Sequence, residues 1–147
     1  MMLDNTAGSD PFVLVCDVFG RPVEPPGSVD LVLDPVVFIE HHGGRLTHEK
    51  IRDWLAGQGP LNCIEICIPK FTDGRGFSVA ARLREAGYTG ELYACGDITQ
   101  DVVYLLRRVG FSHVRLALKP GETLDPAVLQ PFGAYYQITQ DEQFPAL

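Results

Sequence analysis

The sequence predicts an α/β fold with parallel βαβ repeats in its C-terminal two-thirds and a short β segment before them. From residue 47 onwards, apolar runs with the two-residue period of strands alternate with segments that have the 3.6-residue period of helices. Connections from helix to strand are short, whereas those from strand to helix are longer and carry charge. This alternation implies parallel strands joined by right-handed crossovers. An open sheet and a curved half of a βα barrel both satisfy the pattern.

The N-terminal part of the chain is predicted to be rich in β structure. Residues 12–18 (FVLVCDV) and 29–33 (VDLVL) are predicted to form short strands, because β-branched side chains are frequent in both. Residues 36–40 (VVFIE) are a third candidate strand for the same reason. Residues 1–10 are small and polar, and we expect them to form a disordered tail.

Local start and stop signals define the elements of the repeats. Thr47 and Thr99 can cap helices, and Asp125 followed by Pro126 is a strong helix start. Gly57 follows the last apolar position of the first helix and is expected to end it. The predicted helices are 47–57, 77–86, 99–110 and a segment from 125, and the predicted strands are 62–68, 91–95, 112–118 and 131–138.

One strand and the helix after it show which sides face the core. In residues 62–68 (NCIEICI), the three isoleucines fall on one face of the strand. In the next helix, small and apolar residues recur at helical spacing: Gly76, Ala80, Leu83 and Gly87. We expect both faces to point into the core.

The chain length favours one domain. The 147 residues match the usual size of a single domain and can bury a core without metals or disulfides. We therefore assign residues 11–147 to one α/β domain. It comprises a β-rich part (11–46), the βα repeats (47–138) and a short tail (139–147).

The composition argues against several classes of protein. The net charge of −7 disfavours nucleic-acid binding and docking on anionic membranes, since both need clustered Lys and Arg. No apolar stretch approaches the roughly 20 residues of a membrane span. Residues 12–16 are too short for a signal-peptide core. We therefore expect a cytoplasmic protein with free thiols.

Cysteine and histidine spacing does not favour a metal site. The cysteines show no C-x-x-C spacing: Cys16, Cys63, Cys67 and Cys95. In a strand, Cys63 and Cys67 would lie about 13 Å apart, so they cannot form a disulfide with each other, and we expect all four thiols to be core residues. The histidines lack H-x-x-x-H spacing: His41, His42, His48 and His113. Glycine-rich nucleotide fingerprints are also absent from the sequence, and we predict neither a metal nor a cofactor.

Charged residues are concentrated in the loops that follow the strands. Lys70, Asp73 and Arg75 follow the first strand of the repeats, Asp97 follows the second and Lys119 follows the third. The carboxyl ends of parallel strands meet at one edge of a sheet, which is where ligands bind in α/β folds. We therefore expect these five side chains to lie at one end of the domain.

The first of these loops has the composition of an anion site. Gly74 and Gly76 permit positive φ and the close approach of a ligand. A helix beginning near Gly76 would direct free N–H groups towards the loop and suit phosphate, sulfate or sulfite. The predicted ligand-binding residues are Lys70, Asp73, Gly74, Arg75, Gly76, Ser78 and Asp97. In a purely structural alternative, Asp73 caps the helix, Arg75 pairs with Asp97, and the glycines permit a tight turn.

A longer motif carries a family resemblance. Residues 69–92 (PKFTDGRGFSVAARLREAGYTGEL), the following GD, a helix with paired arginines, GF and the closing FGAYYQ resemble the bacterial family called domain of unknown function 934. The likeness is strong over residues 64–137 and weak before Thr47. The resemblance implies a setting in sulfite reduction, as an accessory or oxidoreductase-like protein, with sulfite reductase as the partner.

The chain departs from that family's pattern at three positions. Tyr93 stands where the family tends to have arginine, Gln100 where it tends to have a cation, and Val102 where it tends to have an amide. If the family's site uses the missing groups, the resemblance implies a divergent member with changed activity.

Two functions follow as hypotheses. The first is an accessory protein of assimilatory sulfite reduction that binds an oxyanion or small anionic ligand at the carboxyl edge of the sheet. The alternative is a non-catalytic interaction module that docks on a sulfite-reductase component. It would use the same surface, or Phe71 with Arg107 and Arg108.

A third hypothesis is an enzyme in which Asp97 acts as acid or base and Lys70 or Arg75 stabilises developing charge. For the oligomeric state, a homodimer is the default expectation.

Overall fold

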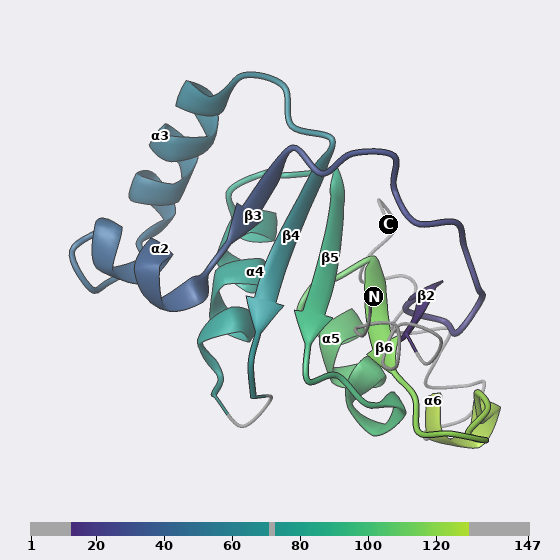
Figure 1. The fold of residues 1–147 in the computed structure, drawn as a ribbon. Helices are drawn as coiled ribbons and strands as arrows, with labels where there is room; N and C mark the ends of the chain where they lie inside the picture. The colour runs from purple at the N-terminus through teal and green to yellow at the C-terminus, as the bar shows by residue number, and fades with distance from the viewer. Residues whose placement is uncertain (1–12, 71–72, 130–147) are drawn as a thin grey trace, which may run out of the picture.

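The described residues share one open five-stranded sheet. The computed structural model describes residues 13–70 and 73–129, and its strand order is β2-β6-β5-β4-β3 (Figure 1). The strands are β2 (Val13–Asp17), β3 (Leu31–Leu33), β4 (Cys63–Ile68), β5 (Glu91–Gly96) and β6 (His113–Ala117). Strands β3 to β6 are parallel, and β2 pairs antiparallel with β6. The predicted α/β class is confirmed, and the sheet is open rather than curved into half a barrel.

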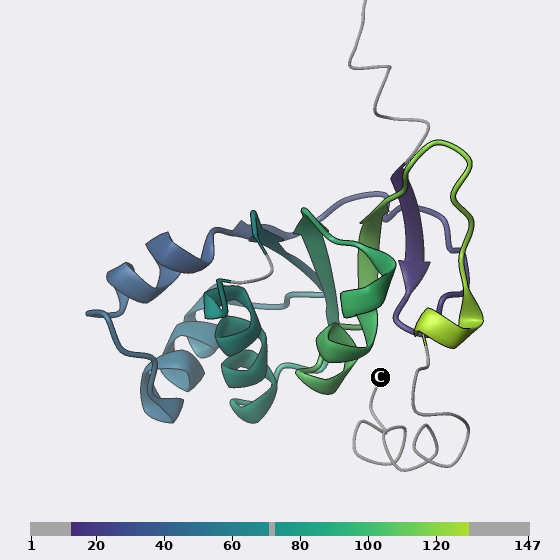
Figure 2. The same cartoon turned by 90° about the horizontal axis from the view of Figure 1, so that it is seen from below.

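Helices alternate with the parallel strands. They are α2 (Pro35–His41), α3 (His48–Gln58), α4 (Arg75–Glu85), α5 (Val103–Arg108) and α6 (Pro126–Leu129), with a 3₁₀ turn η2 (Gln100–Val102) leading into α5. Helices α3, α4 and α5 lie on the same side of the sheet (Figure 2). Because the order β3, β4, β5, β6 always advances in one direction, right-handed crossovers place every connecting helix on the same face.

The main core lies between this face of the sheet and the helices. Ile64, Ile66 and Ile68 of β4 are at most 1% exposed, as the alternation in the sequence predicts. Ala80 and Leu83 of α4 are fully buried in the same cluster. Both predicted faces therefore point into the core, except that Gly87 lies beyond the end of α4 and is exposed.

A second, smaller cluster lies on the opposite face of the sheet. Val15, Cys63 and Tyr93 are buried there, and Val23 and Val29 from the segment between β2 and β3 pack against them. This covering segment has no helix or strand of its own in the described structure. Among residues 13–70 and 73–129, no helical layer like the one over the main core covers much of this face.

Residues 36–40 form helix α2, and the prediction of a third N-terminal strand is wrong. The Asp34 side chain accepts hydrogen bonds from the N–H groups of Val36 (2.9 Å) and Val37 (3.4 Å), and Pro35 occupies the first helical position. Phe38 is 5% exposed and packs edge-on against Trp54 of α3. The cap and this buried contact outweigh the modest strand preference of β-branched residues.

The element boundaries differ from the predictions at three helices. The predicted helix 99–110 is the turn η2 followed by α5, and the Thr99 side chain makes no cap hydrogen bond. Helix α3 continues to Gln58 and ends at Gly59, whose φ of 75° requires glycine, so Gly57 lies inside the helix. Helix α4 begins at Arg75, two residues earlier than predicted, with Gly74 as its cap. Thr47 caps α3 as predicted by accepting the Lys50 N–H at 3.2 Å.

Some predictions fall outside the described residues: the tails 1–10 and 139–147, the strand 131–138 and the contact residue Phe71. Among the helices that the structure does describe, none is long and apolar enough to cross a lipid bilayer.

Candidate ligand site at the carboxyl edge of the sheet

Three charged loops meet at one edge of the sheet. Strands β4, β5 and β6 are neighbours and parallel, so the loops that follow them emerge at the same edge (Figure 1). These loops contain Lys70 and Asp73, Asp97, and Lys119, in that order. The predicted gathering of the loops at one end of the sheet is therefore what the topology produces.

The same topology does not create the usual crevice. In open α/β sheets, ligands bind where neighbouring connections leave towards opposite faces. Strands β3 to β6 advance in a single direction, so no such switch point occurs among the described parallel strands. A ligand at this edge would therefore depend on the loops themselves.

Asp73 and Arg75 form a close ion pair at the start of α4. The guanidinium donates from Nε to Asp73 Oδ1 at 2.9 Å and from Nη2 to Oδ2 at 2.7 Å. Asp73 Oδ1 also accepts the backbone N–H of Arg75 at 3.2 Å. Hydrogen bonds from Arg75 lower the pKa of Asp73 to about 2. Asp73 thus supports the helix start, as the structural alternative predicts.

The same alternative also predicted an ion pair between Arg75 and Asp97, and this prediction is wrong: Arg75 pairs with Asp73. Its charge is satisfied by Asp73, and the carboxylates of Glu40 and Asp34 make smaller contributions that further raise the pKa of Arg75. The Arg75 side chain remains 52% exposed. An incoming anion could therefore reach the guanidinium from solvent.

Neither glycine of this loop has the positive φ that the sequence predicts. Gly74 has a φ of −72°, and Gly76 is not among the described residues with positive φ. A β-carbon on Gly76 would lie 2.7 Å from Ile68 Cγ1, so this glycine permits helix α4 to pack on β4. Positive φ is instead required at Gly96, where φ is 119°.

Lys70, Ser78 and Asp97 are all exposed at this edge. Asp97 is tied to the end of β4 through its backbone, because its N–H donates to the Ile68 carbonyl at 3.1 Å. Their side chains make no hydrogen bond to one another within residues 13–70 and 73–129. The structure brings their loops to one edge without joining the groups into a preformed cluster.

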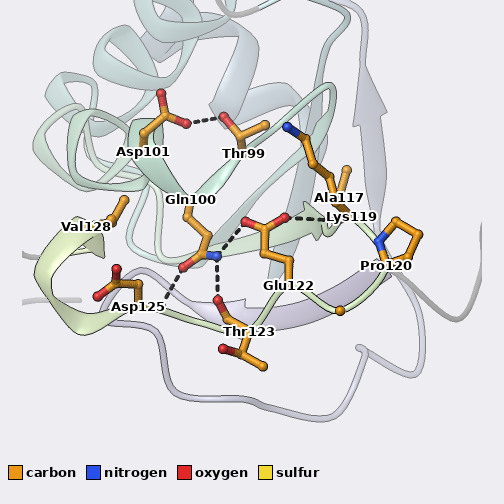
Figure 3. A pocket seen from close by; sticks show the side chains of 11 residues that line it. Thr99, Gln100, Asp101, Ala117, Lys119, Pro120, Glu122, Thr123, Asp125 and Val128 are labelled. Atoms are coloured by element: carbon orange, nitrogen blue, oxygen red, sulfur yellow. Dashed lines mark hydrogen bonds between the residues drawn. The ribbon is translucent and has the colours of Figure 1, made fainter.

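The described surface is hollowed between the second and third loops. This hollow has a volume of about 640 Å³ and lies between the turn after β5 and the loop from β6 to α6 (Figure 3). Its lining includes Thr99, Gln100, Asp101, Lys119, Glu122 and Asp125. The volume is within the range of small-molecule sites.

Gln100 organises the wall of this hollow. Its amide nitrogen donates to Glu122 Oε2 at 2.6 Å and to the Thr123 carbonyl at 2.7 Å, and its oxygen accepts the Asp125 N–H at 2.6 Å (Figure 3). Gln100 is only 6% exposed. It therefore holds the loop before α6 in place.

The charges of the hollow do not match an oxyanion. Hydrogen bonds from the Lys119 N–H and the Gln100 amide lower the pKa of Glu122, which keeps this carboxylate ionised. Asp101 accepts a hydrogen bond from the Thr99 hydroxyl, and Lys119 is the lining cation (Figure 3). Together with Asp125, the lining carries three carboxylates against one ammonium group.

Sequence reasoning did not identify Gln100 or Glu122 as site residues. Gln100 departs from the family pattern, and its partners lie 22 to 25 residues further along the chain. No local spacing links them. Val102, another departure, is 2% exposed and part of the core, and Tyr93 is buried on the opposite face.

Arg107 is buried, contrary to its predicted place in a contact patch. It is 3% exposed, and its guanidinium lies 5.1 Å from the centre of the Phe19 ring. Arg108 is exposed. Phe19 follows the antiparallel strand β2, whose position beside β6 the helix pattern alone does not reveal.

Histidine, cysteine and carboxylate side chains do not assemble into a metal centre in the part of the chain that the structure describes. His42 Nδ1 donates a hydrogen bond to the Phe38 carbonyl at 2.8 Å, and His113 stacks on Tyr93 with ring centres 4.6 Å apart. Both rings thus have packing roles.

The fold defines the class of the protein: a mixed α/β protein with an open, mostly parallel sheet in which strands and helices alternate. Residues 46–147 match the family described as "Bacterial protein of unknown function (DUF934)", and the chain belongs to this family. No curated protein and no solved structure matches the chain. The family assignment confirms the resemblance carried by the DGRGFS motif.

Proposed function

We propose that this protein binds a small oxyanion at the start of helix α4. The observation that carries the proposal is that α4 begins at the carboxyl edge of the sheet with Arg75 in its first turn and the exposed Lys70 in the loop before it. The first N–H groups of a helix lack intrahelical partners and carry partial positive charge. Sulfite, sulfate and phosphate present the oxygens that such groups bind.

The Asp73–Arg75 ion pair does not prevent this binding. Both side chains are substantially exposed, at 36% and 52%, and exposed ion pairs contribute little to stability because water solvates the separated charges well. An oxyanion would take over one or both guanidinium hydrogen bonds. Asp73 would then remain on the Arg75 N–H, or turn towards solvent.

We place this binding in the cytoplasm, in an accessory role in assimilatory sulfite reduction. This setting rests on the family resemblance. A protein that binds the anion without a cofactor would serve a reductase by holding or presenting sulfite. We rank the hypothesis of an enzyme with Asp97 as acid or base below anion binding, because the Asp97 carboxylate has no hydrogen-bond partner among the described residues.

Calorimetric titration tests the anion site directly. Sulfite, sulfate and phosphate are titrated into the wild type and into Lys70→Ala and Arg75→Ala. We expect each substitution to weaken binding about tenfold, since each removes a charge-assisted contact. Arg82→Ala is the matched control, because Arg82 forms an exposed ion pair with Glu85 on the same helix, away from its start. Equal binding by wild type and Arg75→Ala would exclude the proposal.

A second candidate function is docking on a sulfite-reductase component. It is favoured by two exposed apolar side chains on neighbouring elements: Val32 on edge strand β3 is 59% exposed and Val37 on α2 is 62% exposed. Edge strands with exposed apolar groups are ready sites for protein contact. A pull-down with the purified reductase components should recover the wild type and lose Val32→Asp combined with Val37→Asp. Recovery of neither protein would remove this candidate.

A further inference from the structure

Two half-exposed cysteines face each other on neighbouring strands. Cys67 of β4 is in register with Cys95 of β5, and their Sγ atoms are 3.5 Å apart. The hydrogen bond runs from the Cys95 thiol to the Cys67 sulfur. Both residues are partly exposed, unlike Cys16 and Cys63, which are buried. The prediction that all four thiols are core residues is therefore wrong for this pair.

The sheet holds this pair within reach of a disulfide. Side chains alternate along β4, so Cys67 lies on the face opposite the buried Ile66 and Ile68. Directly opposed residues on neighbouring strands have Cα atoms about 4.8 Å apart, inside the range of about 4.4 to 6.8 Å seen in disulfides. Rotation of the two side chains is enough to bring the sulfur atoms to the bonding distance of about 2.05 Å.

A half-buried ion pair adjoins the two thiols. Glu65, two residues before Cys67 on the same face of β4, accepts a hydrogen bond from Arg115 of β6 at 3.2 Å. Burial, followed by hydrogen bonds with Glu65 and Cys67, raises the pKa of Cys95 well above the ordinary thiol value. Cys95 is therefore held as a thiol beside the Cys67 sulfur and the Glu65 carboxylate.

We propose that Cys67 and Cys95 form a redox-active dithiol that exchanges with low-molecular-weight disulfides of the glutathione class. The Cys67 thiolate attacks one sulfur of the disulfide, forms a mixed disulfide and releases one thiolate, which takes up the proton that Cys67 has lost. Cys95 then attacks the Cys67 sulfur, and its proton passes to the small thiolate that departs. The Cys67–Cys95 bond forms, and the second small thiol leaves.

The step balances without any further reactant. Two protein thiols are oxidised to one disulfide, and one small disulfide is reduced to two thiols, so two electrons and two protons are transferred. Burial and the neighbouring Glu65 favour the protonated form of Cys95, so Cys67 is the attacking sulfur and Cys95 is the resolving thiol. This centre lies on the face of the sheet, so it does not depend on the anion site at the edge.

Peptide mapping of the full chain tests the centre. The reduced protein is incubated with oxidised glutathione, quenched by acid, alkylated and analysed by mass spectrometry. We expect the wild type to lose two hydrogens in mass, with a disulfide mapped between the peptides that contain Cys67 and Cys95. Dithiothreitol should restore both thiols.

Single substitutions separate the two roles. Cys95→Ser should accumulate glutathione on Cys67 at least about tenfold above wild type, because the resolving thiol is missing. Cys67→Ser should leave Cys95 reduced over the same time. Cys63→Ser is the matched control: Cys63 lies on the same face of β4 but is 5% exposed, and its loss should not change disulfide formation.

Three outcomes overturn the inference. The wild type remains fully reduced in excess oxidised glutathione, the disulfide maps to any other pair, or the wild type retains an unresolved mixed disulfide. Circular dichroism shows whether each serine variant folds. If a variant does not fold, the disulfide map of the wild type alone tests the proposal.

Discussion

A β-carbon on Gly96 would lie 2.1 Å from the carbonyl oxygen of Ile68, and the φ of Gly96 is 119°. Both facts require glycine where β5 turns into the second edge loop. The contact also explains how the loop of Asp97 stays joined to the end of β4, since the Asp97 N–H donates to the same carbonyl.

Gly96→Ala should destabilise the protein by about 3 kcal/mol, because the new methyl group clashes with backbone and the residue is held in the left-handed region. Gly57→Ala is the matched control. Gly57 lies inside α3 with nothing within 4 Å of an added β-carbon, so alanine there should stabilise by about 0.5–1 kcal/mol. Urea unfolding measures both values. Equal effects of the two substitutions would contradict the geometry at Gly96.

Asp73 should make the stability of the protein depend on acid pH. Its pKa falls from 3.8 to about 2 in the folded protein, so its contribution is complete above about pH 4 and is lost as the pH falls through 2. The difference in unfolding free energy between wild type and Asp73→Asn should follow this profile. Its size should be small, because the pair with Arg75 is exposed. A difference that instead grows below pH 4 would contradict the role of this ion pair.

Gln100→Ala should destabilise the protein by about 2 kcal/mol, because it leaves the Thr123 carbonyl and the Asp125 N–H without the buried amide. Amide hydrogen exchange should rise across residues 119–125, which this side chain holds. Thr123→Ala is the control, since it keeps the backbone carbonyl that Gln100 uses. Unchanged exchange in Gln100→Ala would show that the loop is held by other contacts.

Two neighbouring arginines should differ in their effect on stability. Arg107→Ala should cost about 2 kcal/mol, because it removes a buried side chain that packs on the Phe19 ring. Arg108→Ala should change stability by less than about 0.5 kcal/mol, because Arg108 is exposed. Thermal or urea unfolding compares them in one experiment. The reverse order would place Arg107, not Arg108, on the surface.

Cap residues and side-chain periodicity predicted most of the helices and strands, but they did not predict helix α2. Asp125 with Pro126 predicted the start of α6, yet the same pair at Asp34 and Pro35 starts α2 in a segment predicted as a strand. β-branched residues have only a weak preference for strands, so a cap and a buried Phe38 were sufficient to form a helix.

The sequence by itself determined the alternation of strands and helices, the apolar faces of β4 and α4, and the edge at which the charged loops emerge. These properties depend on periodicity and on the handedness of crossovers, which act over a few residues or one βα unit. The tertiary structure alone decided that Gln100 holds the loop of Glu122 and that Cys67 meets Cys95 from 28 residues away. Each of these contacts depends on the rotamers and the strand register that packing selects, and no local pattern encodes those.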